Sequence, residues 1–123
     1  PLLKQPEQAK KCSVLTVFTG RTYGSDTDVI PTDLGELRKV AQVSWYASLH
    51  DGRYKYIRTF EKDEIEELYD LQKDPEELTN LALFKKHGDR VVKMRDQTVA
   101  ELKRTKAGFV DNLPPTGTEK CVR

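Results

Sequence analysis

A regular alternation of apolar and polar residues predicts a β-hairpin near the middle of the chain. Residues 43–50 and 53–60 alternate on either side of Asp51-Gly52, a dipeptide that favours a two-residue turn with positive φ angles. Such a turn sets Leu49 opposite Tyr54 across the hairpin. One face of the two strands is then apolar and the other mostly polar, which is typical of an antiparallel sheet with one solvated side.

Arg58 is the exception on the apolar face of this hairpin. The two-residue turn places it opposite Trp45. We expect the guanidinium to stack on the Trp45 ring or to pair with a carboxylate, because a cation among apolar side chains needs such a partner.

Two other segments have the pattern of strands. Residues 14–19 are β-branched and aromatic with apolar side chains on both faces, which favours a central strand buried on both sides. Residues 66–71 alternate well enough to form a further strand. With the hairpin, these segments predict an antiparallel sheet of about four strands.

Helical spacing predicts one short helix and one long helix. Asp33 and Glu36 have the spacing of a capping box, so the short helix should cover residues 33–41. The longer pattern covers residues 86–107, and Gly108 is a natural stop. We therefore predict an α+β fold in which the antiparallel sheet packs against a long C-terminal helix.

The apolar stripe of the long helix has three central members, Val92, Val99 and Leu102, with Val91 and Met94 at its edge. We expect this stripe to face the sheet, because an amphipathic helix buries its apolar side.

The two ends of the chain differ in composition from its middle. We expect a flexible lead-in over residues 1–13, one α+β domain over residues 14–108 and a trailing segment over residues 109–123. The chain starts with Pro1 and has no leader sequence, which favours a piece of a longer protein.

Composition and charge narrow the function classes. The chain has 123 residues, with 21 Lys and Arg against 20 Asp and Glu, which gives a net charge of +1. This balance leaves no broad basic surface for nucleic acid. A transmembrane helix would need a run of about 18 apolar residues, and the sequence contains none.

The two cysteines, Cys12 and Cys121, lie near opposite ends of the chain. They are either unrelated thiols or one disulfide between the first strand and the tail. A disulfide would need Cα atoms within about 7 Å and an oxidising compartment.

Motifs that carry chemistry by themselves are missing. The sequence has no glycine-rich phosphate loop, no His-Glu-x-x-His helix and no Cys-x-x-Cys pair. We therefore assign no catalytic residue and no metal ligand to this chain.

One segment, residues 53–82, combines three linked motifs. It reads Arg-Tyr-Lys-Tyr-Ile-Arg, then Glu-Glu-Leu-Tyr-Asp-Leu, then Asp-Pro-Glu-Glu-Leu-Thr-Asn-Leu-Ala. In order and spacing it resembles the C-terminal subdomain of the type I sulfatases, the arylsulfatase family of sulfuric ester hydrolases in the alkaline phosphatase superfamily. The residues that carry the resemblance are Tyr54, Lys55, Tyr56, Leu68, Tyr69, Asp70, Asp74, Pro75, Glu77, Asn80 and Leu81.

These motif residues also have architectural interpretations. Asp74 suits the start of the turn at Pro75, and Asn80 suits a turn or a left-handed conformation. The Tyr69 ring suits a place over the core with its hydroxyl on a partner. We expect these motif residues to be structural.

The resemblance implies a non-catalytic subdomain that completes a sulfatase. The formylglycine signature Cys-x-Pro-x-Arg is absent, because Cys12 is followed by Ser-Val-Leu-Thr. The resemblance implies that formylglycine and calcium belong to an N-terminal catalytic domain, which is the expected partner. It also favours a periplasmic or secreted location, and a second copy of the chain is a further expected partner at the exposed interface.

The alternatives are a free-standing small binding domain and the C-terminal part of a related phosphodiesterase or phosphonate monoester hydrolase. Whether the chain counts as an enzyme is therefore left open.

The resemblance further implies a role for the loop after the first strand, which in sulfatases can face the substrate cleft. Here Arg21 offers a bidentate guanidinium for a sulfate or carboxylate, and Tyr23 offers a ring for stacking. A loop at the interface between domains is the alternative for both residues.

Overall fold

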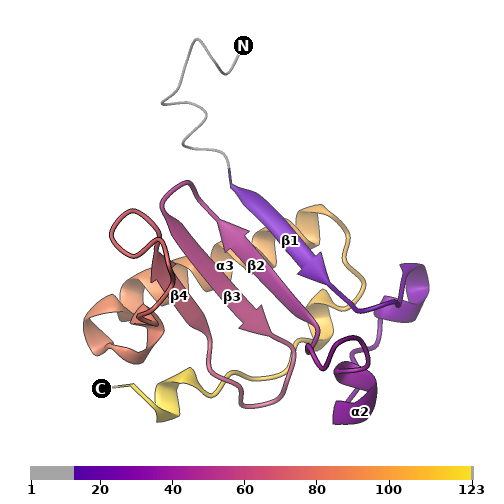
Figure 1. The fold of residues 1–123 in the computed structure, drawn as a ribbon. Helices are drawn as coiled ribbons and strands as arrows, with labels where there is room; N and C mark the ends of the chain where they lie inside the picture. The colour runs from indigo at the N-terminus through magenta and orange to yellow at the C-terminus, as the bar shows by residue number, and fades with distance from the viewer. Residues whose placement is uncertain (1–12, 123) are drawn as a thin grey trace, which may run out of the picture.

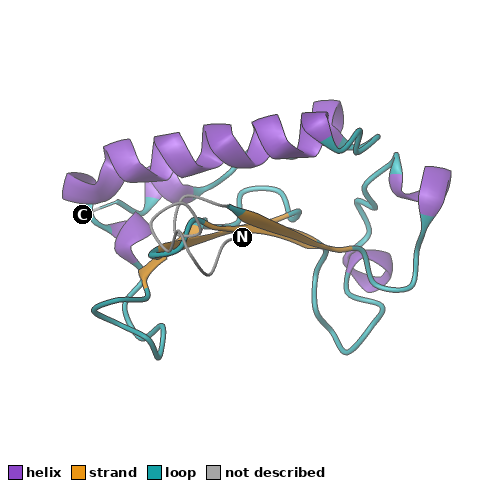
Figure 2. Cartoon of the chain, turned by 90° about the horizontal axis from the view of Figure 1, so that it is seen from above, coloured by secondary structure: helices purple, strands orange, loops and turns teal. Residues whose placement is uncertain are grey.

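The computed structural model describes residues 13–122. Its four strands form one antiparallel sheet in the order β1-β2-β3-β4, so that neighbours in the sequence are neighbours in the sheet (Figure 1). The 17-residue helix α3 lies across one face of this sheet (Figure 2). This arrangement confirms the predicted α+β fold. The strands are β1 (Val14–Phe18), β2 (Tyr46–His50), β3 (Tyr54–Thr59) and β4 (Glu67–Asp70), and α3 covers Gly88–Arg104.

The remaining elements are short. They are helix α2 (Leu34–Leu37) and the 3₁₀ turns η2 (Gly24–Thr27), η3 (Leu81–Leu83), η4 (Lys85–His87), η5 (Val110–Asn112) and η6 (Thr118–Lys120). Twelve residues of the expected lead-in, 1–12, lie outside the described residues, and so does Cys12. The question of a Cys12–Cys121 disulfide therefore stays open.

The hairpin register differs by two residues from the predicted one. Leu49 lies opposite Tyr56 instead of Tyr54. The Asp51 carboxylate accepts hydrogen bonds from the backbone N–H groups of Arg53 and Tyr54, and this lengthens the turn. A shift by two keeps every side chain on its predicted face, because strand side chains alternate with a period of two.

The first strand was predicted to be central, and this was wrong. Strand β1 lies at the edge of the sheet and pairs with β2 alone. Val14 is 59% exposed and Val17 is 40% exposed. Apolar residues on both faces of a strand therefore did not indicate burial within this domain.

The short helix α2 is four residues long, whereas nine were expected. The Asp33 carboxylate caps it by accepting from the Gly35 N–H at 3.3 Å, but the Asp33–Glu36 exchange of a capping box is not among the hydrogen bonds of the described residues. The chain then leaves the helical conformation, and both Ala41 and Gln42 have positive φ angles. Non-glycine residues pay a steric cost in this left-handed region, so the bend depends on its surroundings.

The buried face of α3 consists of Val91, Met94, Thr98 and Leu102. Val92, placed on the apolar stripe by the sequence analysis, is 47% exposed. The correct face follows spacings of three and four residues from Val91, and it includes a threonine. The hydroxyl of Thr98 is satisfied locally, since it donates to the Met94 carbonyl at 2.7 Å.

Helix α3 ends before the predicted stop at Gly108. Lys106 adopts φ +59°, and the Ala107 N–H donates to the Leu102 carbonyl at 2.9 Å, which is the Schellman pattern. Gly108 is needed for another reason. A Cβ at this position would lie 1.8 Å from an Asp28 oxygen, so the backbone must approach that carboxylate closely.

The core between the sheet and α3 has two adjoining parts. One cluster contains Trp45, Phe60 and Phe109 together with Ile30, Leu37, Ala47 and Leu102. The other contains Leu49, Tyr56, Leu68, Ala82, Val91 and Met94. Phe109 comes from the segment expected to trail the domain, and its ring packs against Phe60 with centroids 5.1 Å apart.

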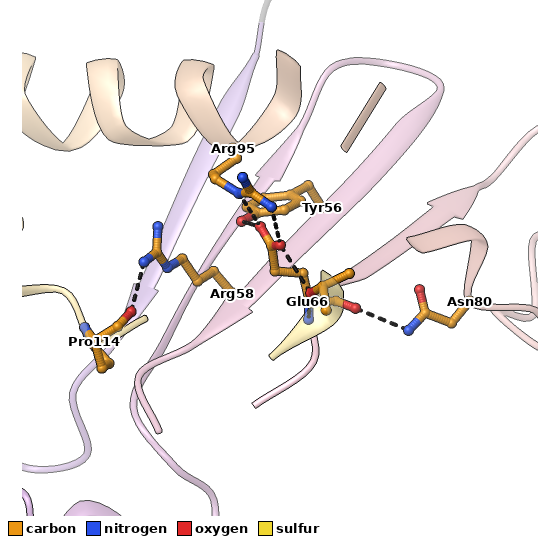
Figure 3. Close-up of polar contacts among 7 residues, drawn as sticks. Tyr56, Arg58, Glu66, Asn80, Arg95 and Pro114 are labelled. Carbon is orange, nitrogen blue, oxygen red and sulfur yellow. Dashed lines mark hydrogen bonds and ion pairs between the residues drawn. The ribbon is translucent and has the colours of Figure 1, made fainter. Parts of the chain in front are cut away.

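A buried carboxylate, Glu66, joins four parts of the fold (Figure 3). Its side chain is 1% exposed and receives two hydrogen bonds from Arg95 of α3, at 2.6 and 2.8 Å. The Tyr56 hydroxyl of β3 and the Thr118 hydroxyl of the tail also donate to this carboxylate. Asn80 donates to the Glu66 backbone carbonyl at 3.0 Å.

These contacts determine how Glu66 and Tyr56 titrate. Burial alone would raise the pKa of Glu66, but the hydrogen bonds from Arg95 and Tyr56 outweigh it and hold that pKa below its usual value. Burial and the adjacent carboxylate raise the pKa of Tyr56. Glu66 is therefore charged and Tyr56 neutral at physiological pH.

Arg58 has neither of its predicted partners. Its guanidinium donates to the Pro114 carbonyl at 2.8 Å, and its Nε is buried without a hydrogen bond (Figure 3). A backbone carbonyl of the tail thus takes the place of the expected aromatic ring or carboxylate. Sequence patterns within the hairpin could not have identified a partner 56 residues away.

The tail is fastened to the turn between β3 and β4. The Asp63 N–H donates to the Pro115 carbonyl, and the Gly117 N–H donates to the Glu64 carbonyl, both at 2.9 Å. A Cβ at Gly117 would lie 2.1 Å from the Asp63 carbonyl oxygen. The close approach of two backbones therefore requires glycine at this position.

We predict that Gly117→Ala destabilises the domain by about 1–3 kcal/mol, because the added methyl group must displace backbone rather than a flexible side chain. Gly88→Ala is the matched control: nothing lies within 4 Å of its would-be Cβ, and the residue is helical. Urea unfolding of the two variants measures the difference. Equal stability of the two variants would contradict the packing described for the tail.

Candidate functional site

The face of the sheet opposite α3 is open and concave. It surrounds a hollow of about 1050 Å³. The floor is formed by side chains that alternate with the core residues along the strands. Members of this open face are Val14, Thr16, Tyr46, Ser48, His50, Lys55, Ile57, Thr59 and Glu67, and all of them line the hollow.

One rim of the hollow is formed by Arg38, Glu61 and Ser44. Arg38 donates to both Glu61 oxygens, at 2.6 and 2.9 Å, and the Ser44 hydroxyl also donates to this carboxylate. The Arg38 guanidinium holds the pKa of Glu61 at about 2, although burial acts in the opposite direction. The Glu61 carboxylate is therefore ionised, and both of its oxygens accept hydrogen bonds from Arg38 or Ser44.

The opposite rim is also paired within the domain. Lys55 and Glu77 form an ion pair at 2.8 Å, with both side chains 32% exposed. The Tyr69 hydroxyl donates to Glu67 at 2.5 Å, and burial together with this carboxylate raises the pKa of Tyr69. Arg38 and Lys55 are thus each paired with a carboxylate, whereas Glu64 and Glu67 line the hollow without an ion pair among the described residues.

A second, smaller hollow of about 470 Å³ lies beside the loop after β1. Arg21 lines it together with Thr19, Gly20 and Thr22 of the same loop and with Glu36, Lys39 and Trp45. The loop is closed by two hydrogen bonds between Thr19 and Thr22, at 2.8 and 3.1 Å. Gly20 has φ +62°, which favours glycine at this turn.

Tyr23 follows Arg21 in the sequence but does not line this hollow. Its side chain is 75% exposed. The structure therefore brings Arg21, and not Tyr23, together with other polar groups. Substrate contact by either residue stays a prediction.

The motif residues of 53–82 hold the ends of β3 and β4 together. Asp70 forms a two-pronged ion pair with Arg53 at 2.8 and 3.1 Å. Asp74 accepts from the Leu78 and Thr79 N–H groups, each at 3.0 Å, so it caps the turn at Pro75 as expected.

Asn80 has the hydrogen-bonding role of a turn residue without a left-handed conformation. Its side chain accepts from the Leu68 and Ala82 N–H groups at 2.9 and 3.0 Å, with φ −77°. Glu77 is the motif residue with positive φ, at 57°. The remaining motif residues are placed in the core or against it: Tyr54, Tyr56, Leu68 and Leu81.

Sequence reasoning missed two groups of the site. The Arg38–Glu61–Ser44 cluster joins residues up to 23 positions apart, and no local pattern indicates it. Trp45 was placed on the apolar face of the hairpin, but the hollow beside it was not expected. No local sequence signal indicated this hollow, because Gly20 and Trp45 are far apart in the sequence and meet only in the fold.

The described part of the chain contains neither a metal-binding cluster nor a membrane-spanning helix. Within residues 13–122 there is no group of three or more His, Cys, Asp or Glu side chains that could hold a metal ion. The same residues include no helix with the length and apolar character needed to cross a bilayer.

Comparison with protein families adds an independent finding. The model of the family described as N-sulphoglucosamine sulphohydrolase, C-terminal, matches residues 2–105. A search of curated proteins gave no match. The matched range includes the whole sheet and all of α3.

We predict that Glu61→Gln lowers stability near pH 7 and that its deficit relative to the unsubstituted chain disappears towards pH 2. The depressed pKa of Glu61 means that its ion pair stabilises the fold above about pH 4.5 and is lost as the pH falls to about 2. Urea unfolding at several pH values measures this. Glu76→Gln, at an exposed position, serves as the control. A deficit of constant size from pH 7 to pH 2 would contradict the assignment.

Proposed function

This chain belongs to the family of N-sulphoglucosamine sulphohydrolase C-terminal domains, which makes it a sulfatase C-terminal domain, and we propose that it completes the enzyme by docking on the catalytic domain through the open face of its sheet. The observation that carries this proposal is the contrast between the two faces. Helix α3 covers one face (Figure 2). The other face surrounds a hollow of about 1050 Å³.

The composition of the open face supports docking. Val14, Tyr46 and Ile57 give its floor apolar area between polar side chains. Apolar floor with a polar rim is the usual anatomy of a protein interface. A sulfatase C-terminal domain implies an N-terminal catalytic domain as its partner, and that domain is the occupant that we propose for this face.

The pairing of charges around the hollow favours the same role. Lys55 is paired with Glu77, and Arg38 with Glu61, so these charges already have partners within the domain. Burying a charge that is already paired costs much less than burying an isolated one. A second domain can therefore cover these two pairs without supplying counter-charges for them.

The loop from Gly20 to Tyr23 is proposed to line the substrate cleft. Arg21 is exposed and makes no ion pair with the described residues, so its guanidinium is free to bind an oxyanion of the substrate. The family description names N-sulphoglucosamine, and we propose a sulfated amino sugar as the substrate class. Formylglycine and calcium are proposed to belong to the catalytic domain, so that this chain positions substrate without reacting with it.

We predict that Ile57→Glu in the full-length sulfatase lowers activity at least about tenfold, because a charge at the centre of the open face opposes docking. Val92→Glu is the matched control, since Val92 is 47% exposed on α3. Activity and the association of the two domains after limited proteolysis are measured. The isolated Ile57→Glu chain should melt like the parent chain, which separates lost docking from lost folding.

Two results would overturn this docking assignment. One is full activity of Ile57→Glu with domains that stay associated. The other is loss of activity in Val92→Glu to the same degree, because that side chain lies away from the open face.

We predict that Arg21→Ala in the full-length sulfatase raises KM and lowers kcat/KM about tenfold, the effect of losing one charge-assisted contact. Lys93→Ala on α3 removes a cation elsewhere and serves as the control. Steady-state kinetics on the two variants checks the prediction. Unchanged kinetics in a folded Arg21→Ala enzyme would exclude a substrate role for this loop.

A further inference from the structure

The two edges of the sheet, β1 and β4, are unlike each other (Figure 1). At the β4 edge the chain occupies its own backbone groups. The Leu68 N–H donates to the Asn80 side chain at 2.9 Å, and the Glu66 carbonyl accepts from the same side chain at 3.0 Å. The Asp70 carbonyl accepts from the Asp74 N–H at 2.7 Å. At the other edge, the backbone of β1 is hydrogen-bonded to β2 and to nothing else among the described residues.

The β1 edge also lacks the features that normally keep edge strands apart. Residues 13–20 contain no charged residue and no proline. An edge strand of this kind is a template for pairing with another strand. Val14 on the open face is 59% exposed, and Val17 on the α3 face is 40% exposed. A strand laid along β1 would therefore bind its outward backbone groups and cover apolar side chains on both faces.

The sequence of β1 is self-complementary in one antiparallel register. A two-fold axis perpendicular to the sheet at Thr16 sets this residue opposite its own copy. Leu15 then lies opposite Val17 of the second copy on the α3 face, and Val14 lies opposite Phe18 of the second copy on the open face. Threonine pairs and pairs of an aromatic with a β-branched residue are favourable cross-strand contacts. The five-residue strand has no charged side chain that would repel its copy.

The neighbouring structure is compatible with this register. The Phe18 ring is stacked on Tyr46 of β2 with centroids 5.5 Å apart, so it is held on the open face. Side chains keep their faces across an antiparallel pair, so both copies of α3 would lie on the same side of the joined sheet. The two open faces would then form one continuous surface on the other side.

We infer that two copies of this chain associate edge to edge through β1, with the two-fold axis at Thr16. The partner that fits this edge is a second copy, because β1 matches its own sequence residue by residue. The inference is independent of the proposed docking on the catalytic domain. Docking uses the side chains of the open face, whereas this contact uses the backbone of the sheet edge.

Sedimentation equilibrium of the 123-residue chain tests the association. We expect a dimer with a dissociation constant below about 1 mM. Val17→Lys should raise this constant at least about tenfold, because each copy would place an ammonium opposite an apolar side chain of the other. Val92→Lys on α3 is the matched control, since Val92 is also exposed, at 47%, but lies away from the edge. Ile57→Glu should dimerise like the parent chain, which separates this contact from docking.

Cysteine variants test the register without depending on Val17→Lys. In a background with Cys12→Ser and Cys121→Ser, Thr16→Cys should form a disulfide-linked dimer under mild oxidation, because the two copies of this position lie opposite each other. Val14→Cys is the control. Its two copies are offset along the strands by about 13 Å in this register, which is beyond the reach of a disulfide.

Three results would overturn the inference. One is a chain that stays monomeric up to about 1 mM, and amides of β1 that resist hydrogen exchange in that monomer would identify the occupant of the edge as part of the same chain. Another is a dimer that a folded Val17→Lys chain forms as tightly as the parent. The third is crosslinking of Val14→Cys as efficient as that of Thr16→Cys.

Discussion

The fold depends on one buried carboxylate. Glu66 connects α3 through Arg95, the centre of the sheet through Tyr56 and the tail through Thr118, while Asn80 holds its backbone carbonyl. Removing one member of a buried ion pair typically costs about 3–5 kcal/mol, because the other charge is left unpaired. All four segments must therefore be in place together, which couples the motif segment, the long helix and the tail into one unit.

This coupling explains why the domain has two unlike faces. The helix and the tail are both held on the Glu66 side, so the side chains on that side are buried by the chain itself. Within residues 13–122 nothing comparable holds a segment over the opposite face, where apolar and polar side chains surround the large hollow. The chain is a sulfatase C-terminal domain, and we propose the catalytic domain as the occupant of that face and the substrate as the neighbour of the loop at Arg21.

Local signals predicted the elements well and their placement less well. The Asp33 cap, the Asp74 turn and the faces of the hairpin were confirmed, because each depends on residues close in sequence. The edge position of β1 was missed, since the side chains on the two faces of a strand do not indicate how many strands pair with its backbone.

The long-range polar contacts of the fold and the hollow beside Trp45 could not be predicted without the structure. Arg58 ends on the Pro114 carbonyl, and Glu66 binds residues up to 52 positions away. Such partners are determined by tertiary packing, and no periodic pattern in the sequence indicates them. The family motif marked the correct segment but not the Trp45 hollow, which forms where three loops meet around one buried ring.

The central claim is that one face is buried within the domain and the other is reserved for the catalytic domain. Hydroxyl-radical footprinting of side chains, compared between the isolated chain and the full-length sulfatase, tests it most directly. We predict that Tyr46 and Ile57 on the open face become protected in the full-length enzyme, while Val92 on α3 is oxidised equally in both. Equal oxidation of Tyr46 and Ile57 in the two samples would contradict the claim.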